Sequence, residues 1–387
     1  MTTYDQLQGT RYQTVRALAR GGMTDLVLAR DTTLGLDVVV KILHVTGAED
    51  IEKDDLDRAR DRLRVEARAL AMFDGHPNIV AVKDLGRTAG GTPYLVLEHL
   101  AGRSLGQEWR ARRALPAAEA VQIVLALLVI LDAVHGKGVV HRDVKPDNVF
   151  LCDGVHAGRT VKLIDFGVAK LVSEPTIEHI APVYRTKKGS IVGTPRWLAP
   201  EQILGWPIDP RTDVYAAALV LYALVAGRTP FADCATIVEQ AATMKKEGAL
   251  PPSRWATQPI PEALDRVLLA ALRFQPADRF QTAMELAHAL EELLPLCDAL
   301  PEEERTNVVV NRAAGPARAD LVEVDLSVAS FDAIPEAPAP REERTALERT
   351  LPLAAAVPRR TLVLITLGTT AVMLGLFLAA ARALGAP

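Results

Sequence analysis

The sequence predicts an α+β chain with a small β-rich part, a larger helical part and one C-terminal transmembrane helix. Three observations lead to this prediction. Strand-like runs crowd the first hundred residues, helical spacing prevails after Gly102, and residues 361–381 carry no charge. The chain has 387 residues. That length exceeds one compact core and favours two or three units.

The first part is expected to form strands that one helix interrupts. The strands are expected at residues 12–18, 25–29, 38–43, 79–85 and 94–97. The helix is predicted because apolar residues recur at spacings of three and four; they are Leu56, Ala59, Leu63, Ala67 and Leu70. Gly75 and then Pro77 are expected to stop it. The helical part is expected to contain short strands near residues 149–151 and 161–164.

Charge and cysteine content exclude several classes of protein. The net charge is only −4, so no global basic field is available for nucleic acid. The three cysteines, Cys152, Cys234 and Cys297, lie far apart and form no CxxC pair. This excludes a disulfide-stapled scaffold and a cysteine-based zinc finger, and it fits a reducing compartment. Residues 1–11 lack the apolar stretch of a secretory signal and are expected to form an N-terminal tail.

The C-terminal segment has the length and composition of a membrane span. Residues 361–381 would form a helix about 30 Å long, which matches the hydrocarbon core of a bilayer. Arg359 and Arg360 precede the segment and Arg382 follows it. This charge bias favours a single-pass protein of the inner (cytoplasmic) membrane, with the preceding part in the cytoplasm. A shorter apolar run at residues 120–131 is expected to be a buried helix of a soluble domain.

Residues 296–358 are expected to form a disordered acidic linker between the folded part and the span. Residues 297–358 contain seven prolines, and twelve Asp or Glu against six Arg. Such a stretch buries too little apolar surface to offset its ordering entropy. The triplet Glu-Arg-Thr ends there at Thr306, Thr345 and Thr350. It is either a repeated motif or the drift of an acidic low-complexity segment. A short tail, residues 382–387, follows the span.

Two polar motifs in the helical part indicate phosphoryl transfer. Residues 141–148 read HRDVKPDN, so Asp143 and Asn148 lie five apart in a polar loop. Asp165 opens the triplet DFG seventeen residues after Asn148. Two carboxylates and an amide on adjoining loops suit metal-assisted phosphoryl transfer: one carboxylate orients the attacking hydroxyl, and the other oxygens hold Mg²⁺ against phosphate.

These motifs at this spacing resemble those of the eukaryotic-like serine/threonine protein kinases of bacteria. The resemblance runs over residues 12–294. It implies a bilobal protein kinase domain at residues 12–295, with an N-lobe at about 12–98 and a C-lobe at about 99–295. It also implies ATP and Mg²⁺ as cofactors and proteins as substrates.

The resemblance implies a role for two residues of the N-lobe. Lys41, in the segment VVVKIL, would hold the α- and β-phosphates of ATP. Glu66 would be its ion-pair partner. Glu66 lies on the predicted helix beside Leu63 and Leu70, and therefore on the same inward face.

The same resemblance assigns four residues of the C-lobe. Asp143 would be the catalytic base, or at least the residue that orients the substrate hydroxyl. Lys145 would neutralise charge on the γ-phosphate. Asn148 and Asp165 would bind Mg²⁺.

Further segments resemble the supports of the kinase site. Gly193 and Thr194 resemble the segment that docks the acceptor residue. Thr194 together with Lys145 fits the serine/threonine type of protein kinase and not the tyrosine type. Residues 199–201 resemble the APE motif, in which Glu201 would pair with Arg279. Asp213 resembles the helix aspartate that braces the catalytic loop.

The expected phosphate loop departs from the family pattern. Gly21 and Gly22 keep the middle of GxGxxG, whereas Ala19 and Thr24 replace the first and third glycines. Glycine permits close approach of the backbone to phosphate, so the substitution at position 19 bears on the flexibility of the loop.

The expected adenine slot is tight but passable. Val39 replaces the usual alanine two residues before the lysine, and Phe150 occupies the floor. The apolar walls would be Leu18, Leu26, Leu97 and Leu100. Glu98 and Leu100 would offer backbone groups to adenine.

The sequence also suggests how the protein could be activated by phosphorylation and how two copies could associate. Arg142 could pair with a phosphorylated residue between Asp165 and Glu201, with Thr186 favoured over Ser190. A stripe of small residues in the predicted span would allow a homodimer; it consists of Ala371, Gly375 and Ala379. The alternative is that small residues are simply frequent in spans.

The leading prediction is therefore a membrane-anchored serine/threonine protein kinase that phosphorylates itself as well as other proteins. A pseudokinase scaffold, which binds nucleotide and signals by interaction, is the alternative from another class. A small-molecule kinase is a third possibility, against which the acceptor-docking and APE segments argue.

Overall fold

The computed structural model describes residues 7–20, 24–43, 53–153, 160–165 and 196–299. All of these residues belong to one compact unit of the chain. The predictions made for Gly21 and Gly22, for residues 166–195 and for the chain after Ala299 lie outside the described residues. The expected linker and transmembrane span belong to that last part.

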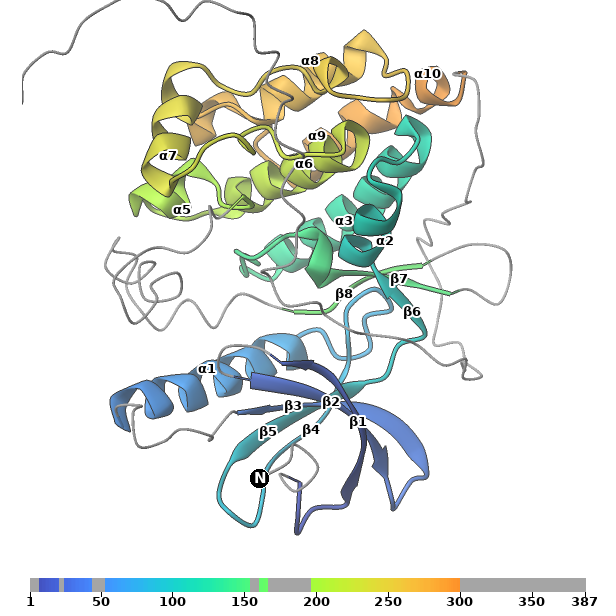
Figure 1. The fold of residues 1–387 in the computed structure, drawn as a ribbon, viewed down its shortest axis with the longest axis vertical. Coiled ribbons are helices and arrows are strands. Elements are labelled where there is room, and N and C mark those ends of the chain that lie inside the picture. The colour runs from blue at the N-terminus through green and yellow to red at the C-terminus, as the bar shows by residue number, and fades with distance from the viewer. Residues whose placement is uncertain (1–6, 21–23, 44–52, 154–159, 166–195, 300–387) are drawn as a thin grey trace, which may run out of the picture. The chain divides into compact units, whose positions relative to one another are not determined.

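The N-lobe contains a five-stranded antiparallel sheet in the order β1-β2-β3-β5-β4 (Figure 1). Its strands are β1 (Tyr12–Arg20), β2 (Thr24–Asp31), β3 (Leu36–Leu43), β4 (Val82–Arg87) and β5 (Pro93–Glu98). Side chains alternate between the two faces of a strand, and in β3 Val40 and Ile42 are buried in a cluster under the sheet. Lys41 therefore points to the opposite face.

Helix α1 (Lys53–Ala71) packs against β4 and β5 and confirms the helix predicted here. Leu63, Ala67 and Leu70 are buried on its inward face, and so is Glu66. The helix ends before Gly75, whose φ of 77° lies in the left-handed region that favours glycine.

Two predictions for the N-lobe were wrong. The strand expected at residues 79–85 begins only at Val82. The residues before it pair with the other lobe instead: Ile79 forms an isolated parallel bridge with Leu163, and the Val80 N–H donates to the Leu163 carbonyl at 2.9 Å. The expected N-terminal tail is part of the fold from Leu7 onward. The Leu7 side chain is 4% exposed in the cluster under the sheet, and Gln8 accepts a hydrogen bond from the Ala89 N–H.

A second sheet, in the order β6-β7-β8, opens the C-lobe. Its strands are β6 (Gly102–Ser104), β7 (Val149–Cys152) and β8 (Thr160–Leu163). Strands β7 and β8 were predicted, whereas β6 was not, since it contains only three residues. Gly102 is required there: its φ is 134°, and a Cβ would lie 2.1 Å from the Leu151 carbonyl oxygen.

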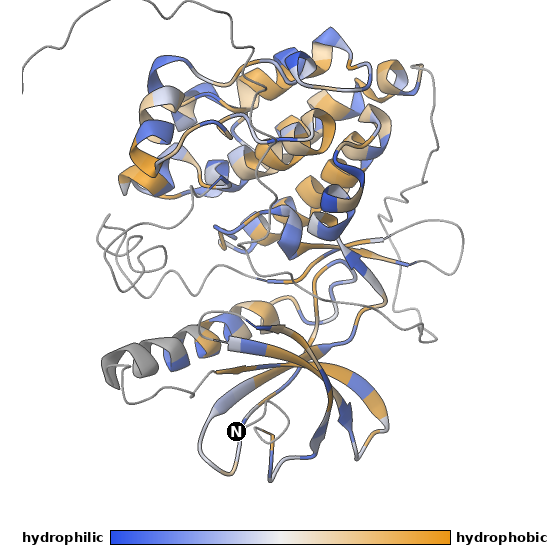
Figure 2. Cartoon of the chain, in the orientation of Figure 1, coloured by the Kyte–Doolittle hydropathy of each residue, from blue (hydrophilic) through white to orange (hydrophobic). Residues whose placement is uncertain are grey.

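Helices make up the rest of the C-lobe. They are α2 (Leu105–Arg112), α3 (Ala117–Gly136), α5 (Pro200–Leu204), α6 (Pro210–Ala226), α7 (Ile237–Lys246), α8 (Glu262–Ala271), α9 (Ala283–Glu291) and α10 (Leu294–Asp298). The described residues also contain single turns of 3-10 helix: η2 (Pro146–Asn148) precedes β7, η4 (Pro252–Arg254) lies between α7 and α8, and η5 (Pro276–Asp278) lies between α8 and α9. Figure 2 shows that α6, at the centre of the lobe, is coloured as hydrophobic along most of its length. The two-lobed arrangement that the sequence predicted is confirmed.

Helix α3 confirms the prediction of a buried helix at residues 120–131. Within the described part of the chain, it is the helix that is long and apolar enough to cross a membrane, but 78% of its most apolar window is buried inside the protein. It packs against α6, α9 and α10. Its apolar side chains are therefore those of a domain core.

The folded part extends past the expected boundary at residue 295. Helix α10 continues to Asp298, and the Cys297 side chain is 4% exposed against the core. Burial of this apolar side chain explains why the last turn belongs to the domain and not to the linker.

Candidate active site

The Lys41 side chain joins the two lobes. Its Nζ lies 2.8 and 2.9 Å from the two carboxylate oxygens of Glu66 on α1, and 3.4 Å from Oδ1 of Asp165, which follows β8. The register of β3 sets this position, because Lys41 lies opposite Leu26 of β2 and Leu95 of β5. The structure thus brings together three residues that the sequence separates by up to 124 positions.

Burial and the contacts among Lys41, Glu66 and Asp165 shift the pKa values of all three groups. Burial raises the pKa of Glu66 to about 8, although Lys41 opposes this rise. Burial also disfavours the Asp165 carboxylate, but Lys41 and Lys145 outweigh it and lower the pKa of Asp165. Burial acts against the charge of Lys41, and the two carboxyl groups overcome it and raise the pKa of Lys41. Of the two carboxyl groups, Glu66 is therefore the one whose charge is disfavoured, and Asp165 is the one whose charge is favoured.

The second cluster surrounds Asp143 in the catalytic loop. Its Oδ2 accepts from Lys145 Nζ at 2.9 Å and from Asn148 Nδ2 at 3.1 Å. Asn148 Nδ2 also donates to the Asp143 carbonyl at 2.8 Å, which holds the loop closed across the turn η2. The Asp143 carboxylate is thereby fixed beside a cation while part of its surface remains accessible, since the side chain is 19% exposed.

The Asp213 side chain on α6 holds the backbone of the catalytic loop, as predicted. Its carboxylate accepts the backbone N–H groups of His141 at 2.7 Å and of Arg142 at 2.8 Å. It also contacts His135 Nε2 at 2.8 Å. Burial lowers the pKa of His141, and a neutral imidazole fits its role as acceptor of the Asp143 N–H at Nδ1. His135 was not identified from the sequence, because no spacing rule connects it to Asp213.

The residues expected to line the adenine slot come from the N-lobe sheet, from the segment after β5 and from β7. Val39 lies opposite Leu97 in the β3–β5 register, and Leu97 and Leu100 belong to or pack against the larger core cluster. Leu18 and Phe150 are buried, 4% and 2% exposed, yet neither belongs to the two core clusters. Leu26, opposite Ala19 and Lys41, is partly buried.

Glu98 has contacts that sequence reasoning missed. Its backbone N–H donates to the Ala81 carbonyl at 3.0 Å, so it is not available to adenine, and only its carbonyl keeps the role predicted here. Its side-chain Oε1 accepts from the Ala81 N–H at 2.9 Å and from Lys162 Nζ at 2.6 Å. Through Lys162, these contacts join the end of β5 to β8. No local sequence pattern could have indicated them.

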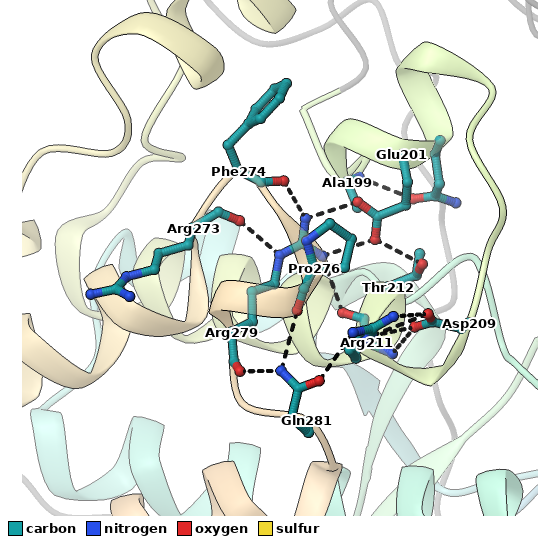
Figure 3. Close-up of polar contacts among 11 residues, drawn as sticks. Ala199, Glu201, Asp209, Arg211, Thr212, Arg273, Phe274, Pro276, Arg279 and Gln281 are labelled. Atoms are coloured by element: carbon teal, nitrogen blue, oxygen red, sulfur yellow. Dashed lines mark hydrogen bonds and ion pairs between the residues drawn. The ribbon is translucent and has the colours of Figure 1, made fainter.

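The predicted APE ion pair is present and fully buried. Arg279 Nη1 and Nη2 each lie 2.8 Å from one carboxylate oxygen of Glu201, and the side chains are 0% and 1% exposed (Figure 3). The guanidinium also donates to the carbonyls of Arg211, Arg273 and Phe274. Every donor group is thus used, and α5 is anchored to the turn η5.

The donor set at this site fits Mg²⁺. The Asn148 NH₂ group is used by Asp143, so its amide oxygen is the atom that can ligate a cation. The Asp165 side chain is 39% exposed beside it in the same lobe and keeps its charge. Oxygen ligands of this kind suit Mg²⁺.

Comparison with known proteins agrees with this geometry. The family model described as protein kinase domain matches residues 12–290. Serine/threonine-protein kinase Pkn1 of Myxococcus xanthus is 35% identical over 316 residues, which cover 80% of this chain and 42% of that protein. Serine/threonine-protein kinase PknB of Mycobacterium leprae is 36% identical over 294 residues, which cover 74% of this chain and 43% of that protein.

A probable serine/threonine-protein kinase of Corynebacterium efficiens is 34% identical over 320 residues, or 79% of this chain and 46% of that protein. The chain thus spans less than half the length of these curated relatives. The family match covers most of the chain and includes all the polar groups described above, from Lys41 to Arg279. The chain belongs to the protein kinase domain family.

Proposed function

We propose that this chain is a serine/threonine protein kinase that transfers the γ-phosphoryl group of ATP to protein hydroxyls, its own included. The observation that carries the proposal is the meeting of Lys41, Glu66 and Asp165 across the two lobes. Protein kinases use ATP and Mg²⁺, and three relatives cited above are named serine/threonine-protein kinases.

Each polar residue has a chemical task in this proposal. Lys41, oriented by Glu66, binds the α- and β-phosphates, and Lys145 neutralises charge on the γ-phosphate. Asn148 and Asp165 hold Mg²⁺, which supplies positive charge against the phosphate oxygens. Asp143 accepts or orients the proton of the attacking hydroxyl from its position between Lys145 and Asn148.

The nucleotide would occupy the slot formed by the apolar residues around Val39 and Phe150. Leu18, Leu26, Leu97 and Leu100 supply its walls, and Gly21 and Gly22 lie in the loop that would cover the phosphates. The carbonyl of Glu98 and a backbone group of Leu100 would bind adenine.

A metal-dependence assay tests the proposal. The full chain is incubated with γ-labelled ATP and a protein substrate, with Mg²⁺ or with a chelator, and the labelled residues are identified. We expect label on serine and threonine with Mg²⁺ only. Label on tyrosine alone, or equal transfer with the chelator, would contradict the assignment.

The pseudokinase alternative finds no support in the site. A scaffold has no chemical need of the complete set of Lys41, Glu66, Asp143, Asn148 and Asp165. A small-molecule kinase is disfavoured because the relatives are named as protein kinases.

We further propose that residues 361–381 anchor the chain in the cytoplasmic membrane, with the kinase domain in the cytoplasm. The support is the uncharged 21-residue segment flanked by Arg359, Arg360 and Arg382. Pairing through Ala371, Gly375 and Ala379 would give a homodimer.

We also propose that phosphorylation of the segment after Asp165 activates the kinase. The support is Arg142, whose buried Nε has no hydrogen-bond partner among the described residues. A phosphate on Thr186, or else on Ser190, would pair with this guanidinium. Mass spectrometry of active protein that finds both residues unmodified would exclude this mechanism.

A further inference from the structure

Gln202 connects the helix of the APE motif with the catalytic loop. Its side chain is buried, and the residue is 7% exposed. The amide oxygen accepts from the Ala199 N–H at 3.0 Å, at the start of α5. The amide nitrogen donates to the Arg142 carbonyl at 2.8 Å, 60 residues away in the sequence. Both ends of the amide are therefore used, and they hold two separate segments.

The Arg142 backbone has the conformation in which such a bond matters. Its φ of 67° lies in the left-handed region, which residues with a Cβ rarely adopt. Its N–H is held by Asp213 of α6 at 2.8 Å, and its carbonyl is held by Gln202 of α5. Two helices thus fix the two peptide groups of a strained residue.

The peptide group that Gln202 holds also leads into the catalytic base. The Arg142 carbonyl and the Asp143 N–H belong to the same peptide unit, and that N–H donates to His141 Nδ1 at 3.3 Å. A rotation of this peptide would move the Asp143 carboxylate away from Lys145 and Asn148. Loss of the Gln202 bond would leave the Arg142 carbonyl without this partner and would favour such a rotation.

We propose that Gln202 is a positioning residue for the phosphoryl-transfer step. It acts through the Arg142 backbone and sets the direction of the Asp143 carboxylate, and it touches neither nucleotide nor metal. The proposal rests on the kinase activity proposed above. A purely structural role of Gln202, as a cap of α5 alone, is the competing explanation.

Two substitutions of Gln202 in the full chain test the proposal. Gln202→Met keeps the length and removes both hydrogen bonds. Gln202→Glu keeps the acceptor for the Ala199 N–H but removes the donor when the new carboxyl is ionised. We expect kcat to fall roughly 10- to 100-fold in both at pH 8. KM for ATP should stay within about twofold of wild type, because the contacts of Lys41 and the adenine slot are unchanged.

Thr212→Val is the matched control. Thr212 Oγ1 donates to Glu201 Oε1 at 2.8 Å, so the variant also loses a buried hydrogen bond of α5, but one that does not reach the catalytic loop (Figure 3). It should lower the melting temperature about as much as Gln202→Met while kcat stays within about twofold of wild type. An equal loss of kcat in Thr212→Val would indicate a structural role only and would overturn the proposal.

The pH dependence of kcat in Gln202→Glu separates a positioning role from a structural one, because a loss of stability alone would not change it. When protonated, the new carboxyl can donate to the Arg142 carbonyl again, so the ratio of variant to wild-type kcat should rise several-fold from about pH 9 to pH 6. A flat ratio, or a Gln202→Met variant with wild-type kcat, would overturn the inference. A wild-type chain without kinase activity would instead refute the proposed function.

Discussion

Lys41 is the residue on which the site depends most directly, because one buried ammonium group faces the carboxyl groups of Glu66 and Asp165. Lys41→Met should lower kcat by roughly 10²–10³-fold or more, since the phosphates lose their cation and two carboxyl groups lose their partner. Phosphate transfer from labelled ATP measures this. Lys83→Met, on an exposed position of β4, is the control and should retain wild-type turnover. Near-wild-type turnover in Lys41→Met would show that the site is wrongly assigned.

Glu66 gives the site a predictable dependence on pH. Burial raises its pKa in the folded chain to about 8 from the ordinary value of 4.5, so between these values the folded chain binds more protons than the unfolded chain. The contribution of this group to stability is therefore present at low pH and lost as the pH rises toward 8. In Glu66→Gln the melting temperature should decline less over this range. Glu262→Gln, on the exposed face of α8, is the control and should follow the wild-type curve.

Residues in sequence motifs could be predicted, and residues that act through tertiary contacts could not. Asp143, Asn148 and Asp165 lie in motifs of fixed spacing, and the resemblance to bacterial kinases that these motifs carry led to Lys41. Gln202, His135 and the side chain of Glu98 were missed. Gln202 reaches a carbonyl 60 positions away, and only the packing of α5 on the catalytic loop brings the two together.

At the scale of elements, the buried pair of Glu201 and Arg279 joins α5 to η5. Arg279→Met should lower the free energy of unfolding by about 3–5 kcal/mol, because it leaves the Glu201 carboxylate buried without its partner. The double variant with Glu201→Gln should recover part of this loss. Chemical denaturation measures both. Arg266→Met, which breaks an exposed pair with Glu262 on α8, should change little. An equal effect in the two single variants would contradict the account.

For one helix and four strands of the N-lobe, local sequence patterns were enough to predict the element. Helix α1 was predicted from its apolar spacing, and strands β1, β2, β3 and β5 were predicted from strand-like runs of residues; β5 is buried at every position but the last. The apolar character of residues 79–81 predicts a strand there. Ile79 and Val80 pair with Leu163 of β8 in the other lobe, whereas Ala81 pairs with Glu98, and local sequence does not reveal such partners.

At the scale of the whole molecule, the kinase domain and the predicted anchor should be separable. Truncation after Pro358 should leave a soluble, active kinase, whereas the full chain should sediment with membranes. If the span also pairs, Gly375→Ile or Ala371→Ile should weaken association in an in-membrane dimerisation assay, and self-phosphorylation should be slower in the truncated chain. A truncated chain that stays with the membrane fraction would refute the anchor, and unchanged association in both variants would refute the stripe.

The central claim is that the chain performs phosphoryl transfer and does not merely bind nucleotide. The most direct test compares the full chain with Asp143→Asn, measuring ATP binding and transfer of labelled phosphate on the same samples. The account predicts similar ATP affinity in both proteins, and transfer that is lower by roughly 10²-fold or more in the variant. It would be contradicted by a wild-type chain that binds ATP and transfers no more phosphate than Asp143→Asn.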